Sequence, residues 1–560
     1  MSSLSAADLD DDVSSLEFNA TDSGLSLDDS NVIYVDDIYG DDLNDGKSQA
    51  TSVKSFEKAL DMANDNDSIQ VARGNYSGLK NTRLTIDKSV SILGSEDTVF
   101  DGADLNYIFK VSDNSRVTFK NIKFINSFKQ ATINNQNSMY GSALEISKAS
   151  VFIDSCYFIR NTVDYDSSVN KFNYGGAISN FGDLTITNSY FDGNIARSTS
   201  GLFSYGGAIY NAGSLLINST TFNNSRAEDF GYGGAIYNDG DLTIDSSIFK
   251  NSISSQETKA SVIFNAGNCI LMNSIVENNT IARANFYYIY GAIYNYGILT
   301  GYGNIFRNNH GVYETPNPEY RGSPTIFNVG DLNMTYSAFM DNDPFNGIAS
   351  DVYLNGGKVI SLDDNWWSTN DNPFETDKVN VDDIVNSWFI FSLSPEYTAL
   401  NIGESVDIVA SWSLSSTLDP KINMFPVLNV TFKTDSIERS NQMVNGITTF
   451  HFDYTQNKGL YEVSTFIGKY NQKVLVDVGK KVSHIKVNVT DNVSYTDDVL
   501  LHIEVTSDDA DVPTGNVSVI VGKTVYAINL TDGKGFLNIS KMDPDRYLFK
   551  IVYEGNDNYF

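Results

Sequence analysis

Short stretches of alternating apolar and polar residues, interrupted by glycine and asparagine, repeat along residues 140–373. The repeated block reads Tyr-Gly-Gly-Ala-Ile-(Tyr or Ser)-Asn, and it stands in full or weaker form at 174–180, 205–211, 232–238, 261–265, 290–295 and 323–328. An apolar residue follows each asparagine by eleven positions, and successive copies of it lie 27 to 33 residues apart. Because only the segment after this residue varies in length, the pattern predicts a solenoid with variable loops on one face.

The constant part of the repeat is predicted to be β-strand. The fourth and sixth positions after most of the asparagines are apolar, as at Leu184 and Ile186. No segment with a helical period separates the strands, and this absence excludes leucine-rich and helical repeats. Stacked coils place equivalent side chains about 4.8 Å apart. The predicted asparagine ladder is Asn180, Asn211, Asn238, Asn265, Asn295 and Asn328, and the predicted aromatic stack is Phe191, Phe222, Phe249, Phe306 and Phe339.

The two cysteines fit this register. Cys269 occupies a position that other coils fill with leucine, so we expect a buried thiol. Cys156 lies more than three coils earlier, which is too far for a disulfide.

These motifs carry a resemblance to known repeats. The Gly-Gly-Ala-Ile-x-Asn block followed by x-Phe-x-x-Asn, as at 191–194 and 306–309, resembles the repeat of polymorphic outer-membrane proteins and of adhesin-like surface proteins of methanogenic archaea. The segment 365–373, with Trp366 and Trp367, resembles the Asn-Trp-Trp-rich end of the β-helix in the methanogen proteins. The resemblance implies an all-β fold built on a right-handed parallel β-helix.

Residues 32–63 differ from the repeat and predict a cap. A strand at 32–35, an acidic turn at 41–47 and a helix at 55–63 resemble the N-terminal cap of pectate-lyase-like β-helices, which covers the open end of the solenoid. The turn gathers Asp41, Asp42, Asn44 and Asp45 beside a glycine. Two interpretations stay open for it, a Ca²⁺ site and a solvated acidic turn, since the spacing is not that of an EF-hand loop. No other cofactor is predicted.

After residue 373 the repeat gives way to two stretches of alternating strands, which predict two immunoglobulin-like β-sandwich domains. The second stretch, with its ending at 551–559, resembles the immunoglobulin-like repeats that form stalks on bacterial surface proteins. The predicted organisation is a disordered acidic leader at 1–30, the β-helix at 31–375, a linker at 376–388, and sandwich domains at 389–480 and 481–560.

Composition limits the partners. Lys and Arg number 38 against 70 Asp and Glu, a net charge of −32, which excludes nucleic acid and argues against anionic membrane surfaces. No run of eighteen apolar residues occurs, so we expect no direct membrane contact. Frequent Asn-x-Ser/Thr sites are compatible with secretion. We expect an extracellular protein attached to the cell surface or wall, with its signal peptide and anchor beyond the ends of this chain.

The known catalytic patterns of β-helix enzymes are missing. Polygalacturonases combine three carboxylates with a histidine and an Arg-x-Lys, and lyases need an aspartate cluster with an arginine base. The repeat region has one histidine, His310, and its Asp363-Asp364 and Asp382-Asp383 pairs point to opposite faces of a strand. We therefore expect no enzyme, with a secreted polysaccharide lyase or glycosidase as the alternative.

Aromatic residues concentrate in and beside the variable segments, and flat rings suit the apolar faces of sugars. The predicted ligand-binding residues are Phe203, Tyr205, Phe230, Tyr232, Phe286, Tyr287, Tyr288, Tyr290, Tyr313 and Tyr320. By resemblance, the expected function is a cell-surface adhesin whose β-helix binds a surface glycan or protein of another cell, above an immunoglobulin-like stalk. Two other interpretations remain open: the rings only pack on the coils, or the protein is a structural spacer of the cell surface.

Overall fold

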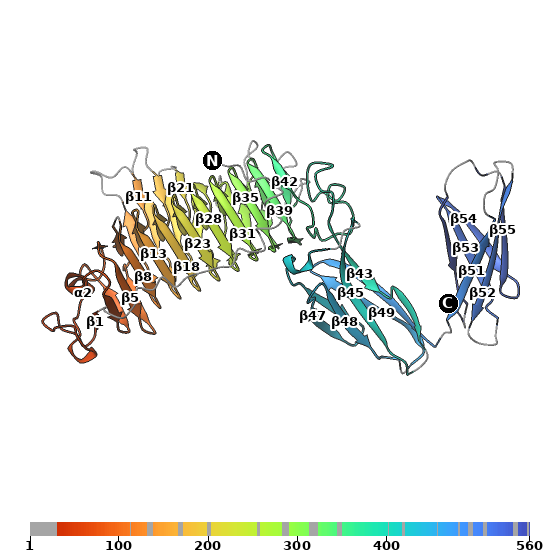
Figure 1. Cartoon of the computed structure of the whole chain (residues 1–560), viewed down its shortest axis with the longest axis horizontal. Coiled ribbons are helices and arrows are strands. Elements are labelled where there is room, and N and C mark those ends of the chain that lie inside the picture. Colours follow the sequence, from red (N-terminus) through yellow and green to blue (C-terminus); the bar gives the residue numbers. More distant parts are fainter. Residues whose placement is uncertain are drawn as a thin grey trace. The chain divides into compact units, whose positions relative to one another are not determined.

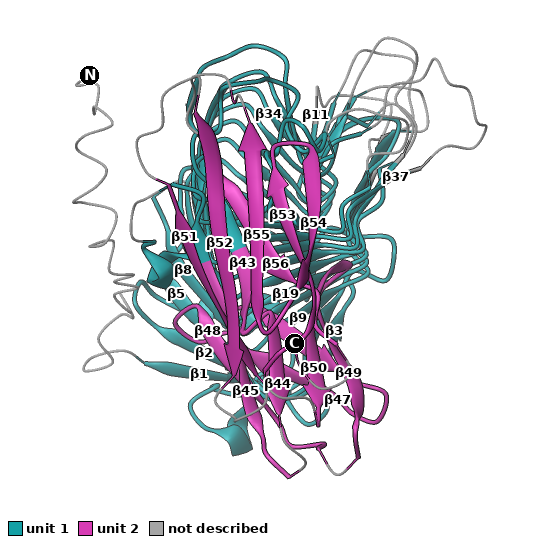
Figure 2. Ribbon diagram, turned by 90° about the vertical axis from the view of Figure 1, so that its right-hand side faces the viewer, with its two compact units in different colours: residues 1–390, 413–426 teal, residues 391–412, 427–560 magenta. Residues whose placement is uncertain are grey.

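The computed structural model describes residues 31–559 except 113, 131–137, 166–171, 199–202, 255–257, 283–289, 313–322, 344–349, 401–402, 417–419, 456, 480–481, 491–496, 508–511, 541, 543–546 and 557–558. The predicted leader at 1–30 lies outside this range. The described chain forms two compact units, one of residues up to 390 with 413–426, the other of 391–412 with 427 onward (Figure 2).

The first unit is a parallel β-helix, as the repeat predicts (Figure 1). Sheet A has twelve parallel strands: β1 (Val32–Val35), β2 (Ser68–Val71), β5 (Val90–Gly94), β8 (Arg116–Lys120), β13 (Ser150–Asp154), β18 (Asp183–Thr187), β23 (Ser214–Asn218), β28 (Asp241–Asp245), β31 (Asn268–Met272), β35 (Ile298–Tyr302), β39 (Asp331–Thr335) and β42 (Val359–Ser361). Sheet B has ten: β3 (Gly74–Ser77), β6 (Thr98–Asp101), β9 (Lys123–Ile125), β14 (Tyr157–Ile159), β19 (Tyr190–Asp192), β24 (Thr221–Asn223), β29 (Ile248–Lys250), β32 (Ile275–Glu277), β36 (Ile305–Arg307) and β40 (Ala338–Met340). Sheet C also has ten: β4 (Leu84–Ile86), β7 (Phe109–Val111), β12 (Leu144–Ile146), β17 (Ile178–Asn180), β22 (Ile209–Asn211), β27 (Ile236–Asn238), β30 (Ala260–Asn265), β34 (Gly291–Asn295), β38 (Ile326–Asn328) and β41 (Val352–Leu354).

Residues of the variable segments form the strands of three shorter sheets. Sheet D contains β10 (Phe128–Gln130), β15 (Thr162–Tyr165), β20 (Ile195–Ser198) and β25 (Arg226–Ala227). Sheet E contains β11 (Ser138–Tyr140), β16 (Phe172–Tyr174), β21 (Phe203–Tyr205) and β26 (Phe230–Tyr232). A two-stranded sheet pairs β33 (Thr280–Ala282) with β37 (His310–Val312). A middle coil therefore runs through C, A, B, D and E before it enters C again.

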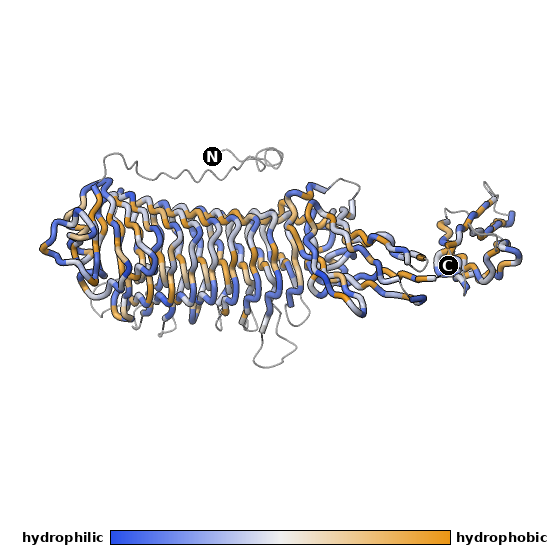
Figure 3. The backbone as a smooth tube through the Cα atoms, turned by 90° about the horizontal axis from the view of Figure 1, so that it is seen from below, coloured by the Kyte–Doolittle hydropathy of each residue, from blue (hydrophilic) through white to orange (hydrophobic). Residues whose placement is uncertain are grey.

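The core is a set of stacked columns inside the coils. Leu184 and Ile186 point inward from β18, and the hydropathy of the tube in Figure 3 alternates around the coils accordingly. Ring centroids from Phe158 to Phe191 and on to Phe222 lie 4.6 Å apart at each step. One strand spacing thus brings each ring onto the next.

Both ends of the solenoid are covered. The helix α2 (Phe56–Met62) follows a short 3₁₀ turn, η2 (Gln49–Thr51), and buries Phe56, whose ring lies 4.9 Å from Phe100. At the other end the Trp367 ring stacks on Phe339 at 4.7 Å and 7°, so it closes the phenylalanine column. The residues predicted as a linker pack here instead, because Val379 is buried and pairs with Val352.

Most strand pairs of the second unit are antiparallel, and one pair, Tyr397–Leu400 beside Leu475–Val478, is parallel. Its first part has β43 (Phe389–Ser394), β45 (Val406–Leu414) and β48 (Ile447–Phe452) in one sheet, and β44 (Tyr397–Leu400), β50 (Tyr470–Val478), β49 (Gly459–Ile467), β46 (Asn429–Lys433) and β47 (Glu438–Gln442) in the other. Stacking of Phe432 on Phe450 joins the two sheets. The segment 413–426, which contains η3 (Ile422–Met424), belongs to the first unit.

The second part places β51 (Ser483–Val489), β52 (Asp498–Ser507) and β55 (Lys534–Ser540) in one sheet and β54 (Thr524–Leu530), β53 (Gly515–Val521) and β56 (Phe549–Tyr553) in another. Leu501 and Val519, one from each sheet, share one buried core. The predicted all-β class, with a capped parallel β-helix before β-sandwich sheets, is confirmed.

Candidate functional site

Sheets D and E lie between sheet B and sheet C along each middle coil, and we call these two sheets together the fin. Asn173 of β16 donates a hydrogen bond from Nδ2 to the carbonyl of Arg197 on β20 at 2.6 Å, so the two sheets are in contact. Small buried side chains such as Ala196 and Ser204 lie on these strands. Figure 2 shows the β-helix viewed along the axis of the solenoid. Sheet A is at the left, β34 of sheet C is at the top, and β11 and β37 are toward the upper right.

The Gly-Gly pair of the repeat makes the bend between the fin and sheet C. Gly175 has a φ of +67°, and a Cβ there would lie 1.9 Å from the carbonyl oxygen of Ile178. Only glycine fits this backbone at so close an approach. The bend brings the ring of Tyr174, which precedes the glycines, to 4.5 Å from Tyr210 in the next coil of sheet C.

Two columns of aromatic rings meet along this bend, and we call them together the aromatic corner. The first column, on sheet E, is Tyr140, Tyr174, Tyr205 and Tyr232, with centroids 5.1 to 5.2 Å apart. The second, on sheet C, is Tyr210, Tyr237, Phe264, Tyr294, Phe327 and Tyr353, with centroids 4.9 to 5.6 Å apart. Lys259 lies over Tyr232, its Nζ 4.7 Å from the centroid.

The stacking decides what the corner offers a ligand. Each ring of the first column lies against the next at 12° to 23°, so the faces of Tyr174 and Tyr205 are covered by neighbouring tyrosines. The expected stacking of sugars on these faces is therefore wrong, and ring edges and hydroxyl groups remain. Burial first, and then Tyr232 and Tyr174, raise the pKa of Tyr205 above its usual range, so its hydroxyl stays neutral.

The other predicted aromatic residues have different places. Phe203 and Phe230 are 37% and 41% exposed beside the first column, with centroids 5.9 Å apart. Tyr290 is buried in the core of the β-helix and lines no surface. The remaining predicted ligand-binding residues, Phe286, Tyr287, Tyr288, Tyr313 and Tyr320, lie outside the described residues.

The predicted asparagine ladder lies inside the turn from sheet C to sheet A. Asn180 donates from Nδ2 to Asn211 Oδ1 at 2.8 Å, and Asn211 donates to Asn238 Oδ1 at 2.7 Å. The same contact links Asn238, Asn265, Asn295 and Asn328 in order. These side chains are fully buried, so they hold the coils together and do not face a ligand.

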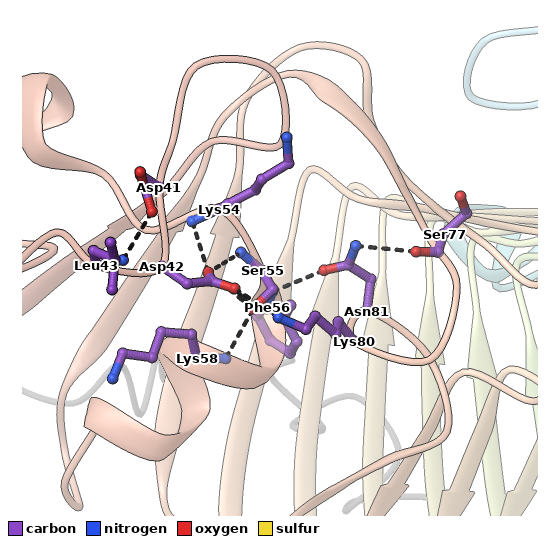
Figure 4. Close-up of polar contacts among 10 residues, drawn as sticks. All are labelled: Asp41, Asp42, Leu43, Lys54, Ser55, Phe56, Lys58, Ser77, Lys80 and Asn81. Atoms are coloured by element: carbon purple, nitrogen blue, oxygen red, sulfur yellow. Dashed lines mark hydrogen bonds and ion pairs between the residues drawn. The ribbon is translucent and has the colours of Figure 1, made fainter.

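The acidic turn of the cap uses its carboxylates within the fold (Figure 4). Asp42 accepts hydrogen bonds from the backbone N–H of Ser55 at 2.8 Å and from Lys80 Nζ at 3.1 Å. Although desolvation opposes it, these contacts lower the pKa of Asp42. Asp41 and Asp45 accept from the backbone two residues onward, and Asn44 donates to the carbonyl of Ser52. Among the described residues, no three His, Cys, Asp or Glu side chains gather for a metal ion.

The paired aspartates found in the sequence do not form a site. Asp363 accepts from the backbone of Asn386 at 2.6 Å, whereas Asp364 accepts from the hydroxyl of Ser387. Each carboxylate of this pair thus serves a different structural contact.

A different group of charges on the fin escaped the sequence analysis. Asp164 is 4% exposed, and its Oδ2 accepts from Arg197 Nε at 2.8 Å, while its Oδ1 has no hydrogen-bond partner among the described residues. Asp229 follows one coil beyond Arg197, has a φ of +62°, and accepts from the backbone of Ser198 at 3.1 Å. Burial raises the pKa of Asp229. The hydrogen bond from the Ser198 backbone lowers this pKa, whereas the negative charge of Asp164 raises it further. Strand register pairs Asp164 with Arg197 but aligns Arg197 with Glu228, so equal spacing in the sequence does not place Asp229 in this group.

Comparisons with known proteins concern the fold. No family model and no curated protein matches the chain. Pectate lyase Pel9A is 13% identical over 60% of this chain and 79% of its own, with a TM-score of 0.29. GH136 lacto-N-biosidase from Eubacterium ramulus is 9% identical over 59% and 67%, with a TM-score of 0.24. XylC in complex with xylose is 9% identical over 79% and 100%, with a TM-score of 0.27.

These neighbours correct the expectation that the chain is not an enzyme. A pectate lyase and a lacto-N-biosidase are among the solved structures with a similar backbone. In the described part of the chain, no helix has the length and apolar character needed to cross a bilayer.

Proposed function

We propose that the β-helix domain is directed at polysaccharide, which it binds along the aromatic corner. The observation that carries this proposal is the first column, whose tyrosine rings repeat every 5.1 to 5.2 Å along the solenoid. This distance is close to the length of one sugar unit in an extended polysaccharide. A polysaccharide parallel to the solenoid axis would therefore place one sugar beside each tyrosine hydroxyl.

The chemistry of the column suits hydroxyl-rich ligands. Neutral phenols both donate and accept hydrogen bonds, as sugar hydroxyls do. The rings are held rigid by stacking, so little conformational entropy is lost when a ligand binds. The exposed rings of Phe203 and Phe230 add apolar surface at the side of the column.

The test removes hydroxyls and keeps rings. The triple variant Tyr174→Phe, Tyr205→Phe, Tyr232→Phe should bind a polysaccharide ligand about a hundredfold more weakly, since each lost hydrogen bond costs about 1 kcal/mol. Tyr190→Phe is the matched control, because Tyr190 is half-buried on sheet B, away from the corner. Affinity is measured by calorimetry on a panel of polysaccharides. Equal affinity of the triple variant and the control would refute the proposal.

Cleavage of polysaccharide is a second candidate function, favoured by Asp164, Arg197 and Asp229. Glycoside hydrolysis needs one protonated and one ionised carboxyl group. In the proposed step, Asp229 gives its proton to the glycosidic oxygen as the bond to the anomeric carbon breaks. Asp164, beside the positive charge of Arg197, takes a proton from the water whose oxygen bonds to that carbon.

The positions of these groups agree with such a step. Asp164 lies on β15 and Asp229 follows β25, two coils later, and two strand spacings amount to about 9.6 Å. Asp229→Asn should abolish release of reducing ends and leave binding intact, whereas Asp183→Asn, at an exposed aspartate that begins β18 of sheet A, should change neither. Cleavage by Asp229→Asn at the wild-type rate would exclude the assignment.

We propose further that the protein works outside the cell, at the cell surface or wall. In this proposal the β-helix meets a surface glycan or protein of another cell, as in the adhesin-like proteins of methanogenic archaea, and the sandwich domains act as a stalk. Support comes from the repeat and from the acidic composition. Binding without cleavage would favour the adhesin over the hydrolase, and neither activity would favour a structural spacer.

A further inference from the structure

Three cationic side chains surround one tyrosine at the N-terminal end of the aromatic corner. Lys129 Nζ, Lys110 Nζ and Arg83 Cζ lie 5.2, 5.6 and 5.8 Å from the ring centroid of Tyr107. The chain as a whole has a net charge of −32 and only 38 basic residues. A local excess of positive charge is therefore a specific feature of this place.

The cluster continues the corner along both columns. In sheet C, Lys110 pairs in register with Glu145, Glu145 with Ser179, and Ser179 with Tyr210, where the second column begins. On the fin, Lys129 donates to the carbonyl of Tyr140, the first ring of the first column, at 2.7 Å. A polysaccharide that followed the corner would reach these cations at its end.

Glu145 balances only part of the charge. Its Oε2 contacts both Lys110, at 3.3 Å, and Lys129, whose side chain is 7% exposed. Burial lowers the pKa of Lys129, while Glu145 raises it and Lys110 lowers it again. Two lysines thus share one carboxylate, and no acidic side chain in the described ranges forms an ion pair with Arg83.

The backbone of Arg83 is held in an unusual conformation. Its φ is +61°, a left-handed value that costs energy in a residue with a side chain. The Arg83 N–H donates to the carbonyl of Tyr107 at 3.0 Å, and the Tyr107 hydroxyl donates to the carbonyl of Arg83 at 3.3 Å. These two contacts hold the Arg83 backbone against Tyr107, and the guanidinium Cζ and Lys110 Nζ lie 5.8 and 5.6 Å from the centroid of that ring.

We infer that Arg83, Lys110 and Tyr107 form a subsite for the carboxylate or sulfate group of an acidic saccharide. The two exposed or half-buried cations contact the anion, and the buried Lys129–Glu145 pair positions them. Arginine forms paired hydrogen bonds with such planar or tetrahedral anions. The inference rests on the proposed function and names its ligand class.

The test compares charged and neutral forms of the same polymer. Polygalacturonate is set beside methyl-esterified polygalacturonate, and dextran sulfate beside dextran, with affinity measured on the full chain by calorimetry at two salt concentrations. We expect at least one acidic polymer to bind about tenfold or more tightly than its neutral partner, with the difference reduced by salt. The negative protein repels polyanions in general, so such binding requires a specific site.

The variant Arg83→Gln, Lys110→Gln should bind the acidic polymer no better than the neutral one. Lys123→Gln is the matched control, because Lys123 is 36% exposed against 31% for Lys110 and pairs with Asp97 on sheet B. Full preference in the double variant, or no preference in the wild type, would overturn the inference.

Failure of this inference can be told from failure of the proposed function. Binding of neutral polymers that depends on the tyrosine hydroxyls, without preference for acid, overturns the subsite alone. No binding of any polymer overturns both. Equal melting temperatures of the double variant and the control show that a loss of binding is not a loss of fold.

Discussion

Substitution of Asn211 by alanine tests how the coils are held together. Asn211 is fully buried. It accepts from Asn180 Nδ2 at 2.8 Å and donates to Asn238 Oδ1 at 2.7 Å, to the carbonyl of Asp241 at 3.1 Å and to that of Gly213 at 3.2 Å. The substitution removes these four contacts, of which the three donated ones share the two Nδ2 hydrogens, and leaves the buried Asn238 Oδ1 without this donor. At about 1 kcal/mol for each bond, and more for an unpaired buried acceptor, we expect a loss of roughly 3 to 5 kcal/mol.

The matched control for this substitution is Asn223→Ala on the outside of the same coil. Asn223 donates to Asp192 Oδ1 and accepts from Asn251 Nδ2, both at 2.7 Å, in a half-buried position where water can replace it. We expect a loss of about 1 kcal/mol there. The comparison therefore separates a buried ladder from a surface ladder of the same residue type.

Denaturant unfolding followed by tryptophan fluorescence measures both losses, since Trp366 and Trp367 are buried in the β-helix. The shift in midpoint multiplied by the slope gives the change in free energy of unfolding. If Asn211→Ala were no less stable than Asn223→Ala, the ladder would not contribute as reasoned. A solenoid's stability is nearly a sum over coils, so the loss should be similar at Asn238.

Three further predictions concern other parts of the molecule. Cys269 is buried and pairs in register with Leu242 and Leu299, so the Cys269→Leu variant should melt within a few degrees of the parent. The Cys269→Asp variant should be severely destabilised, because it buries an unpaired charge. Equal melting temperatures of the two variants would contradict this register. If Asp229 is the proton donor in cleavage, its raised pKa keeps it protonated in mild acid, so the rate should fall as pH rises through that pKa, and a rate that rises instead would exclude the role. Ca²⁺ at Asp41, Asp42, Asn44 and Asp45 stays a prediction, which a fall in melting temperature with chelator would support and an unchanged melting temperature would refute.

The repeat determined the β-helix because a solenoid's contacts are periodic in the sequence. Coils stack one strand spacing apart, so equal positions in successive repeats become neighbours, and Asn180 could be paired with Asn211 from spacing alone. The cap helix followed from local spacing, and the observed bounds, Phe56–Met62, lie within the predicted 55–63. The double tryptophan followed from resemblance, while its physical role, a lid on the phenylalanine column, needed coordinates.

Only the tertiary structure decided the candidate sites. The sequence marked Tyr205 and Tyr232 as rings for the faces of sugars, but the strand spacing stacks these rings on each other and leaves their hydroxyl groups. Arg83 and Lys110 lie upstream of the clear repeat, where no block fixes the register, so their meeting at Tyr107 could not be read from the chain. Asp164 and Asp229 lie in segments of unequal length, and the path of the fin sets their distance. Periodic packing is encoded locally, whereas a site made from different coils depends on where the irregular segments fold.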